Sequence, residues 1–146
     1  MQKSPISTMI EIAVKNSDDA AKRLGKAIKA HEETEKQLSL LSQYRKDYEL
    51  RFQDNAAKGI STSQYLNYQA FINKLDGAVE GQKLVVRDAQ HKIKMAREQW
   101  QESEKKRLSY DTLNNRAITA QQKHEAKLEQ KQTDELAART LFYNKR

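Results

Sequence analysis

The chain has 146 residues, of which 37% are hydrophobic and 32% charged, and its formal net charge is +7. Such a polar chain has too little apolar material for a large globular core, so we expect no compact layered fold. One proline, four glycines and an abundance of helix-forming residues are typical of long helices or coiled coils.

Several kinds of chemistry are excluded or disfavoured by the residue types. The chain has no cysteine, which excludes disulfides, thiolate metal sites and cysteine nucleophiles. Its three histidines are far apart, its acids lack metal-ligand spacing, and no glycine-rich phosphate loop is present. A thin helical chain also lacks the concave pocket that an active site needs. We therefore expect no catalytic residue, no metal, no cofactor and no enzymatic activity.

The beginning of the chain has no apolar signal segment, and no run approaches the roughly 18 apolar residues that a membrane span requires. We therefore expect a cytoplasmic, soluble protein. Its charge is unevenly placed: residues 1–82 carry 12 basic and 11 acidic residues, whereas residues 83–146 carry 15 and 9. The second segment thus holds +6 of the total, which favours an acidic partner or, alternatively, an ordinary solvated helix face.

The first predicted helix spans about residues 6–54. Ser4 followed by Pro5, or Thr8 with Glu11, can cap its start. From there, residues that repeat at alternating steps of four and three form a heptad seam. Its members are Ile6, Ile10, Ala13, Ser17, Ala20, Leu24, Ala27, His31, Thr34, Leu38, Leu41, Arg45, Tyr48 and Phe52.

Residues 55–62 predict a turn, because an asparagine, a glycine and three hydroxyl residues cluster there and Ser61 with Gln64 forms a second capping box. The second helix is predicted over about 63–140. Its seam comprises Tyr68, Ile72, Leu75, Val79, Gln82, Val86, Ala89, Ile93, Ala96, Trp100, Ser103, Arg107, Tyr110 and Asn114.

Residues that face each other across a folded-back chain have position numbers with a constant sum, and here that sum is 120, as for Phe52 and Tyr68. The sequence therefore predicts an all-α fold, a single antiparallel coiled-coil hairpin domain over residues 1–146. Residues 115–146 have no counterpart on the first helix, so we expect the second helix to overhang.

A second apolar stripe lies beside each seam and has the same four-three-four spacing on both helices. Because the helices are antiparallel and both right-handed, the two stripes are expected to form one lateral surface, which we term the docking strip. Its residues are Gln37, Leu41, Tyr44, Tyr48, Phe71, Leu75, Ala78 and Gln82. Such a partly polar, aromatic strip is typical of a protein interface. Alternatively, its rings seal the hairpin tip, an alternative that applies most to Leu41, Tyr48 and Leu75.

The run Asn67–Ile72, with Leu75, Ala78 and Val79, resembles the flagellar export protein FliJ family, as do the docking-strip residues of the first helix. The likeness extends over nearly the whole chain and includes residues 18–21, 58–60 and 134–137. The family resemblance implies a soluble component of the flagellar type III export apparatus, similar to the stalk subunit of rotary ATPases.

The resemblance also implies partners: the hexameric export ATPase, the cytoplasmic domain of the export gate protein FlhA, and export chaperones that the protein escorts. The surface associated with the family maps onto the docking strip, although related proteins carry histidine where this chain has Gln82. We expect the ATPase to bind the open end of the hairpin, through Ala13, Ser17, Ala20, Leu24, Arg107 and Arg116.

This interpretation implies a protein that is monomeric when free, binds no nucleic acid and associates with the membrane only through its partners. The basic character leaves one alternative open, a coiled coil that binds nucleic acid or anionic surfaces. A structural rod that self-associates through the docking strip is another.

Overall fold

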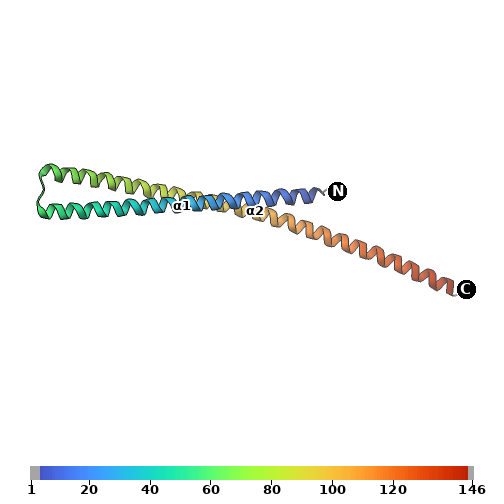
Figure 1. Ribbon diagram of the computed structural model, residues 1–146. Coiled ribbons are helices and arrows are strands. Elements are labelled where there is room, and N and C mark those ends of the chain that lie inside the picture. The colour runs from blue at the N-terminus through green and yellow to red at the C-terminus, as the bar shows by residue number, and fades with distance from the viewer. Residues whose placement is uncertain (1–3, 145–146) are drawn as a thin grey trace. The chain divides into compact units, whose positions relative to one another are not determined.

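The computed structural model describes residues 4–144, which form two α-helices and no strand. Helix α1 (Pro5–Lys58) and helix α2 (Thr62–Asn144) are joined by the short connection of residues 59–61. On either side of this connection the two helices run side by side in opposite directions (Figure 1). The prediction of an all-α helical hairpin is confirmed.

The described residues form two compact units. One unit comprises residues 18–101, which include the connection between the helices. The other comprises residues 4–17, which include the start of α1, and residues 102–144 of α2. The single-domain organisation stays a prediction, and the two units are described separately below.

Helix α1 begins with a serine cap. The Ser4 Oγ accepts a hydrogen bond from the Ser7 backbone N–H at 3.2 Å, and the Ser4 carbonyl accepts one from the Thr8 N–H at 3.2 Å. Pro5 occupies the first helical position, where its missing N–H costs nothing because that group would have no helical partner. Of the two predicted starts, the structure therefore contains the one at Ser4 and Pro5.

Helix α1 ends at Lys58, four residues later than predicted. The asparagine that suggested an earlier end, Asn55, keeps its backbone helical and donates from its side chain to the Tyr68 hydroxyl at 2.5 Å. Gly59 stops the helix because its φ of 95° lies in the left-handed region, which glycine adopts without a steric penalty.

Helix α2 begins with the predicted capping box. The Ser61 Oγ accepts from the Gln64 N–H at 3.1 Å, and the Gln64 side-chain oxygen accepts from the Ser61 N–H at 3.0 Å. Two of the unpaired donors at the helix start are satisfied in this reciprocal way. The helix continues to Asn144, beyond the predicted end near 140.

The core is a narrow line of seam residues. Every residue that is buried within 4–144 belongs to the predicted heptad seams: Ala13, Ser17, Ala20, Ile72, Leu75, Val86 and Ala89. In the unit of residues 18–101, the rings of Phe52 and Tyr68 lie 5.3 Å apart, which agrees with the predicted sum of 120. Arg45 pairs with Asp76 across the same helices, at a sum of 121.

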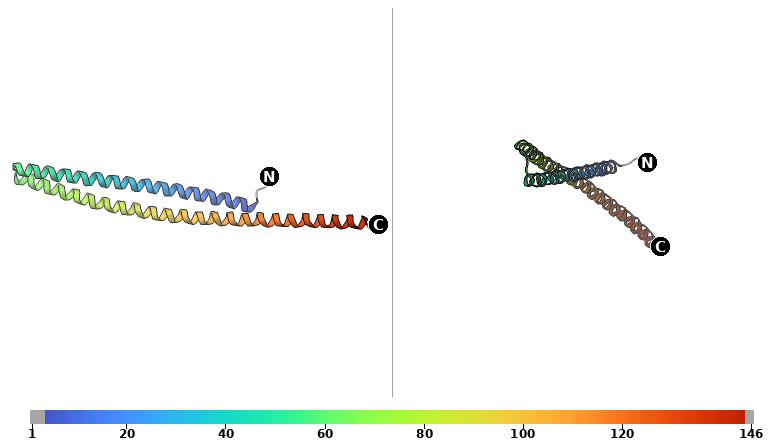
Figure 2. Two further views of the ribbon diagram at one scale, coloured as in Figure 1. Left: turned by 90° about the horizontal axis from the view of Figure 1, so that it is seen from below. Right: turned by 60° about the vertical axis from the view of Figure 1, so that its left-hand side comes forward.

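In the other unit, α2 extends well beyond the part that packs against α1. Residues 116–144 are all exposed, and the orange-to-red part of α2 runs on alone in the left view of Figure 2. The predicted overhang is therefore present and helical as far as Asn144, while residues 145–146 lie outside the described part of the chain. Neither helix of the described chain has an apolar stretch long enough to cross a membrane.

Replacing Gly59 by alanine tests the turn. Alanine at φ of 95° is strained, so we expect Gly59→Ala to lower the free energy of unfolding by about 1 kcal/mol or more in a urea titration. Gly77→Ala is the control, because a Cβ at that helical position meets no atom within 4 Å and should stabilise by about 0.5–1 kcal/mol. Equal effects of the two substitutions would contradict this account of the turn.

Candidate partner-binding surfaces

Aromatic side chains near the turn form one continuous line that alternates between the helices. Tyr44 meets Phe71 edge-on, with ring centroids 6.3 Å apart, and Phe71 lies 4.5 Å from Tyr48. Tyr48 then contacts Tyr68 at 5.3 Å, and Tyr68 in turn contacts Phe52. Offset and edge-to-face geometries such as these stabilise aromatic pairs beyond their buried area. The contact between Tyr44 and Phe71 places the two stripes on the same flank of the hairpin, as the register predicts.

The eight residues of the docking strip differ in exposure. Gln37, Tyr44 and Ala78 are exposed, with 48% of Tyr44 accessible. Leu41, Tyr48, Phe71 and Gln82 are half-buried, whereas Leu75 is only 7% accessible. Leu75 therefore contributes to the seam, and a partner would meet chiefly the exposed outer side of the strip.

Gln82 has a structural contact of its own. Its side-chain Nε2 donates to the Thr34 backbone carbonyl at 3.0 Å and so joins the two helices. A glutamine amide does not titrate, so this position provides a pH-independent link where the resemblance would place a histidine.

One exposed residue beside the docking strip, Leu40, is not among those predicted from the heptad spacing. Leu40 is 63% accessible and lies beside Gln37, Leu41 and Tyr44, where the four residues line a shallow, mainly apolar hollow of about 420 Å³. The signal was present in the sequence, because Leu40 is four residues from Tyr44 and three from Gln37 and so shares their side of the helix.

A cross-helix ion pair lies on the other side of the seam. Arg45 donates to both Asp76 and Glu49, with 2.6 Å between its Nη1 and the Glu49 Oε2. The hydrogen bond to Asp76 and, to a smaller extent, the one to Glu49 raise the pKa of Arg45 above its ordinary value. The arginine therefore remains charged and holds the register from the flank opposite the docking strip.

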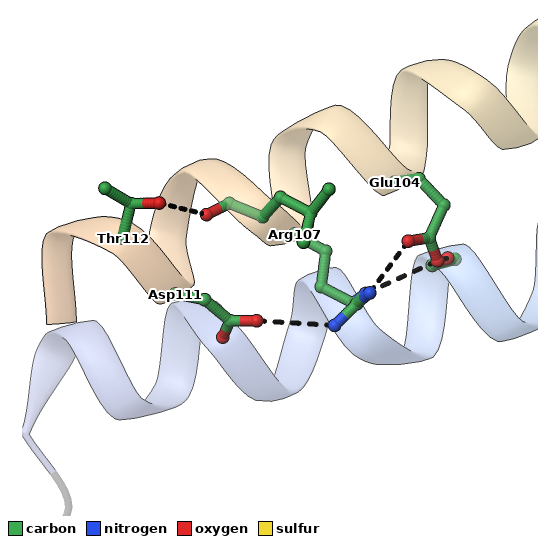
Figure 3. A network of polar contacts seen from close by, with 6 residues as sticks. Glu104, Arg107, Asp111 and Thr112 are labelled. Atoms are coloured by element: carbon green, nitrogen blue, oxygen red, sulfur yellow. Dashed lines mark hydrogen bonds and ion pairs between the residues drawn. The ribbon is translucent and has the colours of Figure 1, made fainter. Parts of the chain in front are cut away.

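A second polar network joins the helices in the unit of residues 4–17 and 102–144 (Figure 3). The Ser17 hydroxyl donates to the Glu104 Oε1 at 2.5 Å, and the serine is only 2% accessible. The Arg107 guanidinium lies between two carboxylates, with its Nη2 at 2.8 Å from the Glu104 Oε2 and its Nη1 at 3.3 Å from the Asp111 Oδ2. The hydrogen bonds from Arg107 and then from Ser17 lower the pKa of Glu104 below its ordinary value.

The six residues predicted to contact an ATPase lie in different environments. Ala13, Ser17 and Ala20 are buried between the helices, and Leu24 and Arg107 are half-buried. Only Arg116 is exposed. A partner could reach the three small residues only if the helices separated, so in this structure they serve helix packing.

No group of three or more metal-ligating side chains occurs within residues 4–144. The seam histidine, His31, is half-buried, and its Nε2 lies 3.2 Å from the Glu35 Oε1 one turn along α1.

The Glu104 network predicts a pH dependence of stability. Because the folded pKa of Glu104 is lowered, its stabilising contribution is complete above the unfolded value of about 4.3 and is lost as the pH falls through the lower folded value. Glu104→Gln should therefore show a smaller loss of stability than the wild type between about pH 5 and pH 3 in urea titrations. Glu98→Gln removes an exposed carboxylate from the same helix and controls for net charge. Identical slopes for Glu104→Gln and the wild type would refute the role of the network.

Comparison with known proteins identifies the family. The chain matches the family described as "Flagellar FliJ protein" over residues 2–146. It is 30% identical over 141 residues to the flagellar FliJ protein of Salmonella typhi, covering 97% of this chain and 96% of that one. It is also 30% identical over 137 residues to that of Escherichia coli (strain K12), covering 94% and 93%. The chain therefore belongs to the flagellar FliJ protein family and is, as such, a component of flagellar protein export.

Proposed function

We propose that the protein is a non-enzymatic linker of the export apparatus that contacts two partners through separate surfaces. The docking strip and Leu40 bind the cytoplasmic domain of the export gate protein FlhA. The unit of residues 4–17 and 102–144 binds the hexameric export ATPase. The same protein escorts export chaperones, and it acts in the cytoplasm, where only its partners hold it at the membrane.

The observation that carries this proposal is the exposed outer side of the docking strip. Tyr44 and Leu40 leave 48% and 63% of their surface open to solvent, although the hairpin is otherwise rich in charged side chains. Tyrosine is among the residues that most often dominate the binding energy of protein interfaces, and exposed apolar residues that lie together on a surface mark interaction sites. Because the Phe71 ring packs against Tyr44 and is itself packed against Tyr48, the surface is preorganised, and binding costs little side-chain entropy.

The proposed ATPase contact is supported by the exposed part of α2. Residues 116–144 form about eight helical turns that bury no side chain within the described chain. A helix of this length gains little stability from its backbone alone, and a partner that covers one side of it would stabilise it further. Ala13, Ser17 and Ala20 then contribute to ATPase binding only indirectly, because they hold α1 and α2 together.

The two proposed surfaces share no residue and lie in different units, so each contact can be removed separately. A change in the docking strip should leave ATPase stimulation intact, and a change in the α2 overhang should leave gate binding intact. This separation is what a linker between ATP hydrolysis and the export gate requires.

The double variant Gln37→Ala/Tyr44→Ala tests the gate contact, because both positions are exposed and their loss spares the core. Leu75 is less suitable, since its removal would also destabilise the hairpin. We expect at least about tenfold weaker binding to the FlhA cytoplasmic domain, equivalent to about 1.4 kcal/mol, and ATPase stimulation within about twofold of the wild type.

Leu84→Ala/Gln90→Ala is the matched control, because it removes an exposed leucine and an exposed glutamine outside the docking strip. It should bind the gate domain as the wild type does. Loss of gate binding and ATPase stimulation to the same extent, in a Gln37→Ala/Tyr44→Ala variant that is still helical by circular dichroism, would refute the division of surfaces.

A further inference from the structure

Three shallow hollows follow one another along one side of α2 in its last 43 described residues, 102–144. The central hollow, of about 410 Å³, is lined by Thr112, Asn115, Arg116, Thr119, Ala120 and Lys123. The others, of about 380 and 450 Å³, lie within residues 102–109 and 127–138. In each, the lining contains residues spaced i, i+3, i+4 and i+7, which is the hole that receives a side chain of a neighbouring helix in a coiled coil.

These hollows face away from α1. At about 100° per residue, Arg116 points about 180° from Arg107, and Arg107 belongs to the network that contacts Ser17 of α1. Apart from Ser103, the other lining residues point within roughly 100° of Arg116. The hollows therefore form one continuous face on the side of α2 that α1 leaves uncovered, about 54 Å long from residue 102 to residue 138.

Charges are segregated around the middle of this part of α2. Three acids line the outer ends of the hollows, Glu102 at one end and Asp134 and Glu135 at the other, whereas the charged lining residues between 105 and 131 are all cations: Lys105, Lys106, Arg116, Lys123, Lys127 and Lys131. The acids of the same segment, Asp111, Glu125 and Glu129, point toward the opposite side of the helix. We term the lining residues from 105 to 131 the cationic face.

The central cations of this face are not neutralised within the chain. Among residues 4–144, no ion pair involves Arg116, Lys123, Lys127 or Lys131. Lys123, Lys127 and Lys131 also follow one another at intervals of four residues, a spacing at which like charges destabilise a helix by about 0.2–0.5 kcal/mol per pair. The cationic face is therefore unfavourable for the free helix and favourable only against an anionic partner.

We infer that the cationic face binds an acidic α-helix of a partner protein, which lies along α2 with small or acidic side chains in the hollows. The hollows supply the shape of a helix-packing surface, and the cations that border them supply the charge complementarity. Thr112, Thr119 and Ala120 are small enough for the backbone of such a helix to approach closely. This inference does not depend on the ATPase being the partner.

Two other occupants fit the face less well. A second copy of this chain would present the same cations, so pairing through this face would be repulsive. Nucleic acid and anionic membranes match the charge, but the cationic face has no aromatic side chain for base stacking and no apolar side chain for insertion into a bilayer.

The test uses the full-length protein and a synthetic helical peptide of about 28 residues, or four heptads, that carries glutamates along one side. Its counterpart has glutamine at the same positions. We expect the glutamate peptide to bind in fluorescence anisotropy and the glutamine peptide to bind at least about tenfold more weakly. Arg116→Gln/Lys123→Gln/Lys127→Gln should weaken binding of the glutamate peptide by at least about tenfold, equivalent to about 1.4 kcal/mol.

The matched control is Lys15→Gln/Lys22→Gln/Lys26→Gln, which removes three exposed lysines with the same spacing and gives the same net charge of +4 from +7. Both triple variants lose the same long-range charge attraction, so a difference between them reports on local contacts. The control should change binding less than about threefold. A steric pair completes the design: Ala120→Trp fills the central hollow and should weaken binding by at least about fivefold, whereas Ile118→Trp, at an exposed position that points about 160° away from Ala120, should not.

Several results would overturn the inference. An equal loss of glutamate-peptide binding in both triple variants would mean that only the net charge of the protein determines binding. Tighter binding of a single-stranded DNA oligomer or of phosphatidylserine vesicles, with no effect of Ala120→Trp, would mean that the face is a general polyanion surface. No binding of the glutamate peptide at low salt would show that the face receives no acidic helix.

Discussion

The packing of small seam residues between two antiparallel helices is the constraint on which the rest of this structure depends. The buried residues are few and mostly short, so the helices approach closely and their register is specified by a narrow line of contacts. That register brings Tyr44 next to Phe71 and makes one docking strip from two stripes. In the same way, the contact of Ser17 with Glu104 fixes which side of α2 is covered and which side is left for the cationic face.

The polar contacts across the seam complement this packing because they form at only one helix register, whereas apolar contacts can form at several. A seam of alanine and leucine tolerates a shift by one heptad, whereas the ion pair of Arg45 with Asp76 and the hydrogen bond from Gln82 to Thr34 each form at a single register. Glu104, held by Arg107 and Ser17, has the same effect in the other unit. The chain thus places its polar seam contacts where a slip would disrupt its candidate binding surfaces.

The sequence predicted the helices, the seams and the shared flank of the docking strip because these follow from local rules. Heptad spacing specifies which side of a helix is buried, and the chemistry of Ser4 and Ser61 specifies where the helices begin. It misplaced the end of α1, because Asn55 suggested a turn while its side chain instead bonds Tyr68 across the hairpin. Such a long-range contact has no local signature. The burial of Leu75 follows from its place in the predicted seam, whereas the extent to which Leu40 stays exposed depends on the distance between the helices, which spacing alone does not specify.

The central claim, that the chain doubles back at Gly59 in this register, can be tested by measuring distances between spin labels. The chain has no cysteine, so labels can be attached to Lys46→Cys and Lys74→Cys, which are exposed and at the predicted sum of 120. With helix axes about 10 Å apart, the account predicts a label separation of roughly 10–25 Å, and roughly 30 Å or more when the second label is moved to Lys94→Cys. A separation near 42 Å for the first pair, as in one unbroken helix, would contradict it.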